Sequence, residues 1–190
     1  MVKRITDVFG AILGLAFLGM LLPFVAVAIK LTSPGPVFYR QKRVGKGGKT
    51  FYVWKFRTMI SEAERQEGLW SKEADPRVTT VGAFLRRTRF DELPQCWNIL
   101  KGEMSIIGPR PERLKVVEEL QKKFPVYALR HSVKPGMAGW AMVNRSNMLS
   151  FEDAKVRLEY DLYYIKHQSL WFDAAIFLRA LVQLLLLRGR

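Results

Sequence analysis

The chain has 190 residues, which is enough for one domain with a hydrophobic core and short for two. Apolar residues make up 49% and charged residues 25%, which excludes a disordered chain and a polytopic membrane protein. Lys and Arg exceed Asp and Glu to give a net charge of +14, so we expect an anionic partner: nucleic acid, an anionic membrane surface or a phosphate-rich substrate. The single cysteine, Cys96, excludes an internal disulfide and is interpreted as a small buried residue.

An uncharged apolar run extends from Val8 to Ile29. A signal peptide and a spanning helix are both open readings, because small residues near its end loosely permit cleavage and 22 residues just suffice to span. A third reading follows from Pro23, which removes a backbone hydrogen bond and clashes with the preceding turn. The part before Pro23 reaches only about 22 Å at ~1.5 Å per residue, whereas the hydrocarbon core is ~30 Å thick.

Basic residues flank this run on both sides. Positive charge at both ends is natural when both ends stay in the cytoplasm. We therefore predict a re-entrant membrane helix over residues 1–32, with a kink at Leu22 and Pro23 inside the membrane. A cytoplasmic catalytic domain over residues 33–190 is predicted to follow it.

The rest of the chain predicts an α-rich α+β fold. β-branched and aromatic residues over Val37–Gln41 and Thr50–Phe56, separated by glycines, predict a small β-hairpin. Residues 170–188 are apolar but too polar to span comfortably, which favours an interfacial C-terminal helix. Between Lys30 and Arg57 there are eight basic residues and no acidic one, so this stretch is expected to meet lipid headgroups or phosphates. Apolar spacing predicts further helices at 60–67, at 81–87, from about 91, at 111–124 and at 151–166.

The segment around Asp91 has the strongest chemical signal. Pro94 is favoured in a first helical turn, so Asp91 and Glu92 are expected at a helix N-terminus. That position stabilises negative charge and would keep Asp91 ionised, as a carboxylate nucleophile must be. Arg86 and its basic neighbours, just upstream, are suited to phosphate oxygens. Taken alone, these residues fit simple helix capping beside a basic face better than they fit a nucleophile.

Other motifs accompany this segment in a fixed order along the chain. Together they resemble the bacterial sugar transferases, also called monotopic phosphoglycosyl transferases, over nearly the whole chain. The chain looks like the minimal single-domain form of that family, with one N-terminal membrane segment. The motifs are Ser33-Pro34-Gly35-Pro36, Gln41, Arg43, Gly45, Gly48, Lys55-Phe56-Arg57-Thr58-Met59, Asp75-Pro76-Arg77, Leu85-Arg86, Asp91-Glu92-Leu93-Pro94-Gln95, Gly108-Pro109-Arg110-Pro111 and Val133-Lys134-Pro135-Gly136.

The resemblance implies a two-step reaction. The Asp matching Asp91 attacks the β-phosphate of a UDP-sugar, releases UMP and holds the phosphosugar covalently. A polyprenyl phosphate, such as undecaprenyl phosphate, then takes the phosphosugar in the first membrane step of a bacterial glycan or exopolysaccharide pathway. Asp91 and Glu92 are implied to hold the required Mg²⁺, which would bring phosphates and a carboxylate together against charge repulsion.

The supporting residues are arginines and a lysine that could hold nucleotide and carrier phosphates, because a forked guanidinium matches phosphate geometry. Met142 stands where the family usually has Gln, so a polar contact there is in doubt. The expected location is the cytoplasmic face of the bacterial inner membrane, in contact with lipids and without nucleic acid. The oligomeric state stays open, with a homodimer as one alternative. The expected substrate-binding residues are Lys55, Arg57, Arg86, Arg110 and Arg145.

Two alternative functions remain open. A metal-dependent glycosyltransferase that moves a sugar without its phosphate commonly uses an Asp-x-Asp motif, which this sequence lacks, and it would release UDP instead of UMP. A membrane-tethered nucleic-acid binder would explain the charge but not the context of Asp91 and Glu92, and the sequence has no recognisable nucleic-acid motif.

Overall fold

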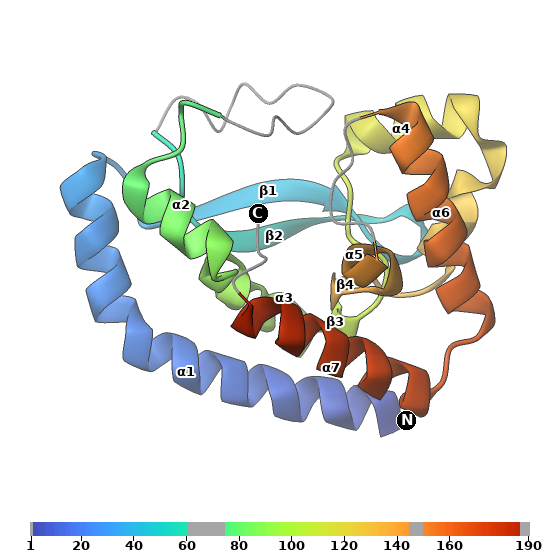
Figure 1. Cartoon of the computed structure of the whole chain (residues 1–190), viewed down its shortest axis with the longest axis horizontal. Coiled ribbons are helices and arrows are strands. Elements are labelled where there is room, and N and C mark those ends of the chain that lie inside the picture. The colour runs from blue at the N-terminus through green and yellow to red at the C-terminus, as the bar shows by residue number, and fades with distance from the viewer. Residues whose placement is uncertain (1, 61–74, 145–149, 187–190) are drawn as a thin grey trace.

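The computed structural model describes residues 2–60, 75–144 and 150–186 of the chain (Figure 1). As predicted, the fold is rich in helix and has a small β-hairpin and one long apolar N-terminal helix. Residues 61–67 of the helix predicted at 60–67 lie outside the described residues. In chain order the elements are α1 (Val2–Thr32), β1 (Phe38–Val44), η1 (Lys46–Gly48), β2 (Thr50–Phe56), α2 (Thr80–Arg87), η3 (Phe90–Gln95), α3 (Cys96–Lys101), β3 (Ser105–Ile107), α4 (Leu114–Lys123), η4 (Pro125–Ser132), β4 (Gly136–Ala138), α5 (Trp140–Asn144), α6 (Phe151–Lys166) and α7 (Leu170–Leu185).

Helix α1 runs along one side of the molecule and bends along its length (Figure 1). Pro23 lies inside it, and a proline in a helix interior removes one backbone hydrogen bond and bends the helix. The helix is long and apolar enough to cross a membrane. Its inward face packs on the domain through Ala11, Leu18 and Ile29, while most of its large apolar side chains are exposed.

Both ends of α1 are bound to the same domain. At the start, the buried Asp7 carboxylate accepts hydrogen bonds from the Ser105 hydroxyl and the Ile106 amide, each at 2.9 Å. Arg4 donates to the carbonyls at the end of α3, where the helix dipole favours a cation. At the other end, Arg57 donates to the carbonyls of residues 33 and 34. The helix is therefore held at each end by charged side chains.

The predicted hairpin is confirmed, with a longer first strand. β1 pairs antiparallel with β2 from Phe38–Phe56 to Val44–Thr50, so β1 continues past Gln41 to Val44. The short turn η1 joins the strands, and Gly47 and Gly48 both have positive φ there, which glycine adopts without strain.

A second, parallel pair of strands was not predicted. β3 pairs with β4, and Gly108 and Gly136 bring the two segments so close that a Cβ at Gly136 would lie 2.1 Å from the Gly108 amide nitrogen. Two helix predictions also need correction. The helix expected from Asp91 is a 3₁₀ turn, η3, that continues into α3, and the helix expected from residue 111 begins only at Leu114.

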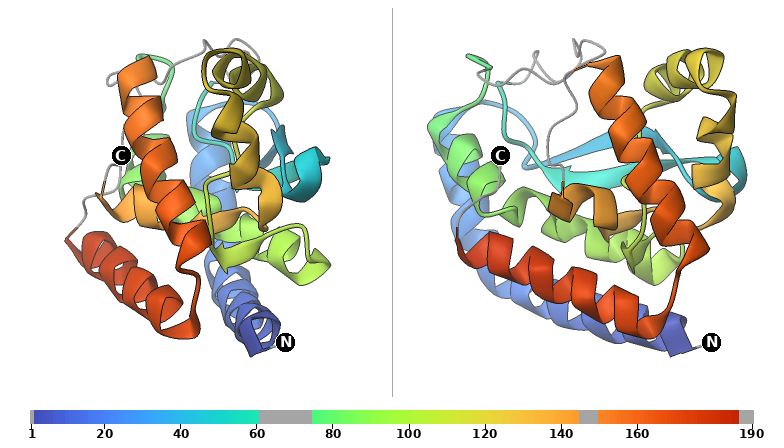
Figure 2. Two further views of the ribbon diagram at one scale, coloured as in Figure 1. Left: turned by 90° about the vertical axis from the view of Figure 1, so that its right-hand side faces the viewer. Right: turned by 45° about the vertical axis from the view of Figure 1, so that its right-hand side comes forward.

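Helix α7 lies on the same side of the molecule as α1, and the hairpin lies above them in these views (Figures 1 and 2). The two helices are linked where they begin, because Lys3 forms an ion pair with Asp173 at 2.6 Å. Asp173 also accepts from the Tyr164 hydroxyl at 2.7 Å, which ties α7 to α6. The described part of α7 exposes a row of large apolar side chains: Trp171, Phe177, Leu178, Leu181, Val182 and Leu185.

Candidate active site

The candidate active site is built on η3, which follows a sharp reversal of the chain. Arg89 precedes η3 with a φ of 54°, a left-handed conformation that is uncommon for a residue other than glycine. The reversal puts Asp91 and Glu92 in the first turn of η3, where both side chains are buried. The sequence predicted this position at a helix start, although the helix is 3₁₀ at that point.

Glu92 accepts hydrogen bonds from two cations on the same oxygen. Lys55 Nζ, from β2, lies 2.8 Å from Glu92 Oε1, and Arg110 Nη2 lies 2.7 Å from it. Although burial opposes ionisation, Arg110 and Lys55 hold the pKa of Glu92 well below its usual value. The structure thus brings together three of the predicted site residues in one ion cluster around the buried Glu92.

Asp91 is in a different state from its neighbour. Burial raises the pKa of Asp91 to about 6, against the lowering effect of the Lys55 charge, and the negative Glu92 raises it further. Within the part of the chain that the structure describes, no donor is hydrogen-bonded to the Asp91 carboxylate. Two adjacent carboxylates therefore differ: one is neutralised by cations, and the other is left with its oxygens available.

Arg86 approaches Asp91 from α2. Its positive charge lowers the pKa of Asp91, and its Nε donates to the Thr58 hydroxyl at 2.9 Å. Gly82 allows α2 to pack this closely, because a Cβ there would lie 1.9 Å from the Thr58 carbonyl oxygen. The arginine is therefore directed towards the site by a close contact between α2 and the end of the hairpin.

Arg57, another predicted site residue, lies away from this cluster. The Arg57 guanidinium is buried and donates to the carbonyls of Pro34 at 2.8 Å and Ser33 at 2.6 Å, at the end of α1. These bonds support a role in holding α1 and do not place Arg57 against Asp91. Arg145 lies outside the described residues. Met142 is buried in α5.

Asp91 and Glu92 are also candidate ligands for a magnesium ion. Among the described residues there is no group of three or more metal-binding His, Cys, Asp or Glu side chains. Mg²⁺ is usually held by one or two carboxylates together with substrate phosphates. Among the described residues no donor is hydrogen-bonded to the Asp91 carboxylate. Both hydrogen bonds to Glu92 fall on Oε1, so Oε2 could bind a metal ion. The donor set therefore fits a Mg²⁺ ion that is also bound by substrate oxygens.

Sequence reasoning missed the residues that hold the turn at Arg110. Arg130, in η4, donates to the main-chain carbonyl of Arg110 at 3.1 Å and forms a buried ion pair with Asp161, in α6, at 2.6 Å. These residues are 20 and 51 positions from Arg110, and an isolated Arg or Asp on a helix is ordinarily solvated. No local pattern could have found them.

Comparison with known proteins identifies the family of the chain. Residues 1–186 match the family model for bacterial sugar transferases. The chain is 43% identical over 175 residues to the UDP-N-acetylgalactosamine-undecaprenyl-phosphate N-acetylgalactosaminephosphotransferase of Aeromonas hydrophila, covering 92% of this chain and 41% of that protein. It is 46% identical over 178 residues to the UDP-glucose:undecaprenyl-phosphate glucose-1-phosphate transferase of Escherichia coli (strain K12), covering 93% of this chain and 38% of that protein.

A relative of the same name from Caulobacter vibrioides is 40% identical over 185 residues, which is 96% of this chain and 69% of that protein. The chain thus spans about two fifths of the length of the Aeromonas and Escherichia relatives and about two thirds of the Caulobacter one. The structure is therefore that of an α-rich domain with a long apolar helix and a buried pair of carboxylates beside cations. The chain belongs to the bacterial sugar transferase family.

Proposed function

We propose that this chain transfers a sugar 1-phosphate from a UDP-sugar to undecaprenyl phosphate or a similar polyprenyl phosphate, and releases UMP. The observation that carries the proposal is the pair Asp91 and Glu92, in which Glu92 is bound by two cations and Asp91 is left without a bound donor in the described residues. The names of the relatives supply the substrate classes. The product, a polyprenyl diphosphate sugar, starts a bacterial glycan or exopolysaccharide.

In the first step an Asp91 carboxylate oxygen attacks the β-phosphorus of the donor. The bond from that phosphorus to the bridging oxygen breaks, and the electron pair leaves with UMP. In the second step a phosphate oxygen of the carrier attacks the same phosphorus, and the bond to Asp91 breaks. The carboxylate is regenerated, so no activated water and no histidine base are needed.

The surrounding cations would stabilise the negative charge of the substrate phosphates and orient them. Lys55 and Arg110 lie within hydrogen-bonding distance of Glu92, and Arg86 approaches from α2. We propose that all three bind donor and carrier phosphates. Asp91 and Glu92 would hold Mg²⁺, which neutralises phosphate charge and assists the departure of UMP. Arg57 is assigned to the attachment of α1.

We further propose that α1 is re-entrant. A spanning helix would carry its two ends to opposite faces of the bilayer, yet Asp7 and Arg57 bind the two ends of α1 to one domain. The bend of α1 shortens its reach (Figure 1), and exposed side chains such as Phe24 and Leu31 give it an apolar outer surface. Helix α7, with Trp171 exposed at its start, would lie in the interface beside it, on the cytoplasmic face of the inner membrane.

The test is an incubation of the detergent-solubilised protein with a panel of UDP-sugars, Mg²⁺ and undecaprenyl phosphate. We expect UMP and a polyprenyl diphosphate sugar from at least one donor. A donor given without the carrier should yield near one UMP per active site and then stop, as two-step exchange requires. Release of UDP instead of UMP would contradict the reaction, and UMP that appears only with the carrier would contradict the covalent step.

A further inference from the structure

The turn that carries Arg110 is held in place by hydrogen bonds that its main-chain carbonyls accept from other parts of the fold. Pro109 and Pro111 flank Arg110, and a proline has no N–H, so this turn offers few donors and depends on what its carbonyls accept. Four residues from three other elements, β1, η4 and β4, supply the donors. The carbonyl of Pro109 accepts from the Gly136 amide at 2.9 Å, that of Arg110 from Arg130 Nη2 at 3.1 Å, that of Pro111 from Arg43 Nη1 at 3.3 Å and that of Glu112 from the Val44 amide at 2.9 Å.

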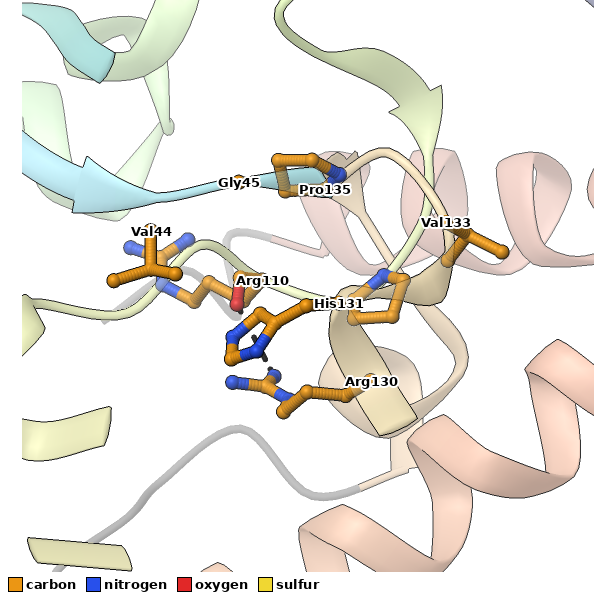
Figure 3. A pocket seen from close by; sticks show the side chains of 8 residues that line it. Val44, Gly45, Arg110, Arg130, His131, Val133 and Pro135 are labelled. Carbon is orange, nitrogen blue, oxygen red and sulfur yellow. Dashed lines mark hydrogen bonds between the residues drawn. The ribbon is translucent and has the colours of Figure 1, made fainter. Parts of the chain in front are cut away.

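Among these donors Arg130 is the one buried side chain, and its guanidinium lies against the Arg110 carbonyl (Figure 3). Its side chain and that of Asp161 are each only 2% exposed. Nη2 and Nε both donate to Asp161 Oδ2, at 2.6 and 3.2 Å, and Nη1 donates to the Tyr127 hydroxyl at 2.7 Å. The two bonds from Nε and Nη2 to Asp161 by themselves set the plane of the guanidinium, because it is rigid and planar. Arg130 therefore presents a fixed hydrogen bond to the Arg110 carbonyl.

The other end of Arg110 reaches the reaction centre. Its Nη2 lies 2.7 Å from Glu92 Oε1, directly beside the buried Asp91. A chain of contacts thus connects Asp161 in α6, through Arg130 and the backbone of Arg110, to the carboxylate pair. Catalytic groups must be held to within about 0.5 Å, so release of this turn would misplace the Arg110 guanidinium.

We propose that Arg130, held by Asp161, is a positioning residue for phosphosugar transfer. It acts through the main chain of Arg110 and fixes the guanidinium that Glu92 and the donor diphosphate share. The catalytic part of this inference rests on the proposed function, whereas the part that concerns the turn does not.

The test compares Arg130→Lys in two backgrounds. Lysine keeps the charge beside Asp161 but cannot hydrogen-bond Asp161 and the Arg110 carbonyl with the planar geometry of a guanidinium. In the wild-type background we expect kcat/KM for UMP release to fall on the order of ten-fold, as for coupled residues in contact. In an Arg110→Lys background the same change should have less than about a two-fold effect, since the group that Arg130 positions is already altered. An equal loss of kcat/KM in both backgrounds would overturn the proposal. If Arg130 contributed only to general stability, the losses caused by the two substitutions would be independent and would multiply.

A second readout is independent of activity. Amide hydrogen exchange of peptides that cover residues 108–114 should become faster in Arg130→Lys. Unchanged exchange there would overturn the proposal even if activity fell, and faster exchange would support the positioning contact even if no UDP-sugar proved to be a donor. Asp161→Asn, which keeps the side-chain shape, should reproduce both effects more weakly and replaces Arg130→Lys if that protein does not fold.

The matched control is Tyr127→Phe. It removes the partner of Nη1 and leaves the bonds of Arg130 to Asp161 and to Arg110. We expect a lower melting temperature, unchanged exchange over residues 108–114 and kcat/KM within about two-fold of wild type. Coupling between Tyr127→Phe and Arg110→Lys as strong as that of Arg130→Lys would show that general packing, and not the hydrogen bond to the carbonyl, is responsible.

Discussion

Arg110 donates to Glu92 at 2.7 Å, on the same carboxylate oxygen that Lys55 approaches at 2.8 Å. Besides its proposed role as a magnesium ligand, Glu92 holds two cations next to Asp91. A carboxylate that organises cations and one that attacks phosphorus respond differently to neutralisation. The two adjacent residues can be separated on this basis.

Asp91→Asn keeps the shape of the side chain and removes the attacking charge. We expect UMP release at background level and no protein labelled by a donor with radiolabel in the sugar. Glu92→Gln should lose a large part of the activity, on the order of 10²-fold, because its cations are loosened and one metal ligand is weakened. Raised Mg²⁺ should recover some activity of Glu92→Gln and none of Asp91→Asn. A labelled Asp91→Asn protein would exclude Asp91 as the nucleophile.

The rate of the first step should depend on pH through Asp91. Burial raises the pKa of Asp91 to about 6, and only the ionised form attacks, so UMP release should fall about ten-fold per pH unit below that value. The measurement is the UMP burst without carrier between pH 5 and 8, because a phosphate monoester carrier itself titrates near pH ~6. A flat profile over this range would argue that Asp91 is ionised throughout and that its burial is relieved when the donor binds.

The same pKa has a consequence for stability. The folded-state pKa of Asp91 lies above its usual value of 3.8, so the folded protein binds more protons than the unfolded one between about pH 4 and 6, and stability falls as pH rises through this window. Asp91→Asn should therefore be more stable than wild type at pH 7, by on the order of 1–3 kcal/mol, and this gain should disappear below about pH 4. Urea unfolding at pH 4 and 7 measures it. A destabilised Asp91→Asn at pH 7 would mean that attraction to the cations outweighs burial.

Gly14 lies where α1 approaches α3, and a Cβ there would come within 2.5 Å of Cys96 Sγ. Gly19 in the same helix has open space within 4 Å. Alanine favours a helix by about 1 kcal/mol over glycine, so Gly19→Ala should raise thermal stability slightly, whereas Gly14→Ala should lower it because α1 is displaced. The measurement is the melting temperature of each variant and of the wild type in the same detergent. Equal stabilisation by both changes would show that α1 does not dock closely on α3.

Single cysteines test the membrane placement of α1. In a Cys96→Ser background, cysteines at Val2 and at Leu31 should both resist an impermeant thiol reagent applied outside sealed cells, because both ends of α1 are bound to one domain. Permeabilised cells should label both, which serves as the control. Labelling of Val2 alone in sealed cells would show a spanning helix, and Pro23→Ala should increase that fraction by straightening the apolar run.

Periodicity located most of the helices, and α6 begins and ends where the apolar spacing predicted. It could not find the β3–β4 pair, because each strand has three residues and a period-2 pattern needs a longer run. The sequence predicted the same phosphate-binding role for Lys55 and Arg57, but their side chains lie in different places in the structure. β2 ends at Phe56, so Lys55 on the strand faces Glu92, whereas Arg57 beyond it turns to the end of α1. The end of a strand is where local patterns are least informative.

The ion pair between Lys3 and Asp173 joins residues 170 positions apart. A ribosome that adds about 5–20 residues per second therefore needs roughly 10–30 s to make the partner after Lys3 has been made. During that interval the apolar helix that begins beside Lys3 has no completed domain on which to pack, and exposed apolar surface is prone to aggregation. Delivery of α1 to the bilayer during synthesis would shield it. The last contacts to form would then be those that draw the finished domain down onto a helix already in place.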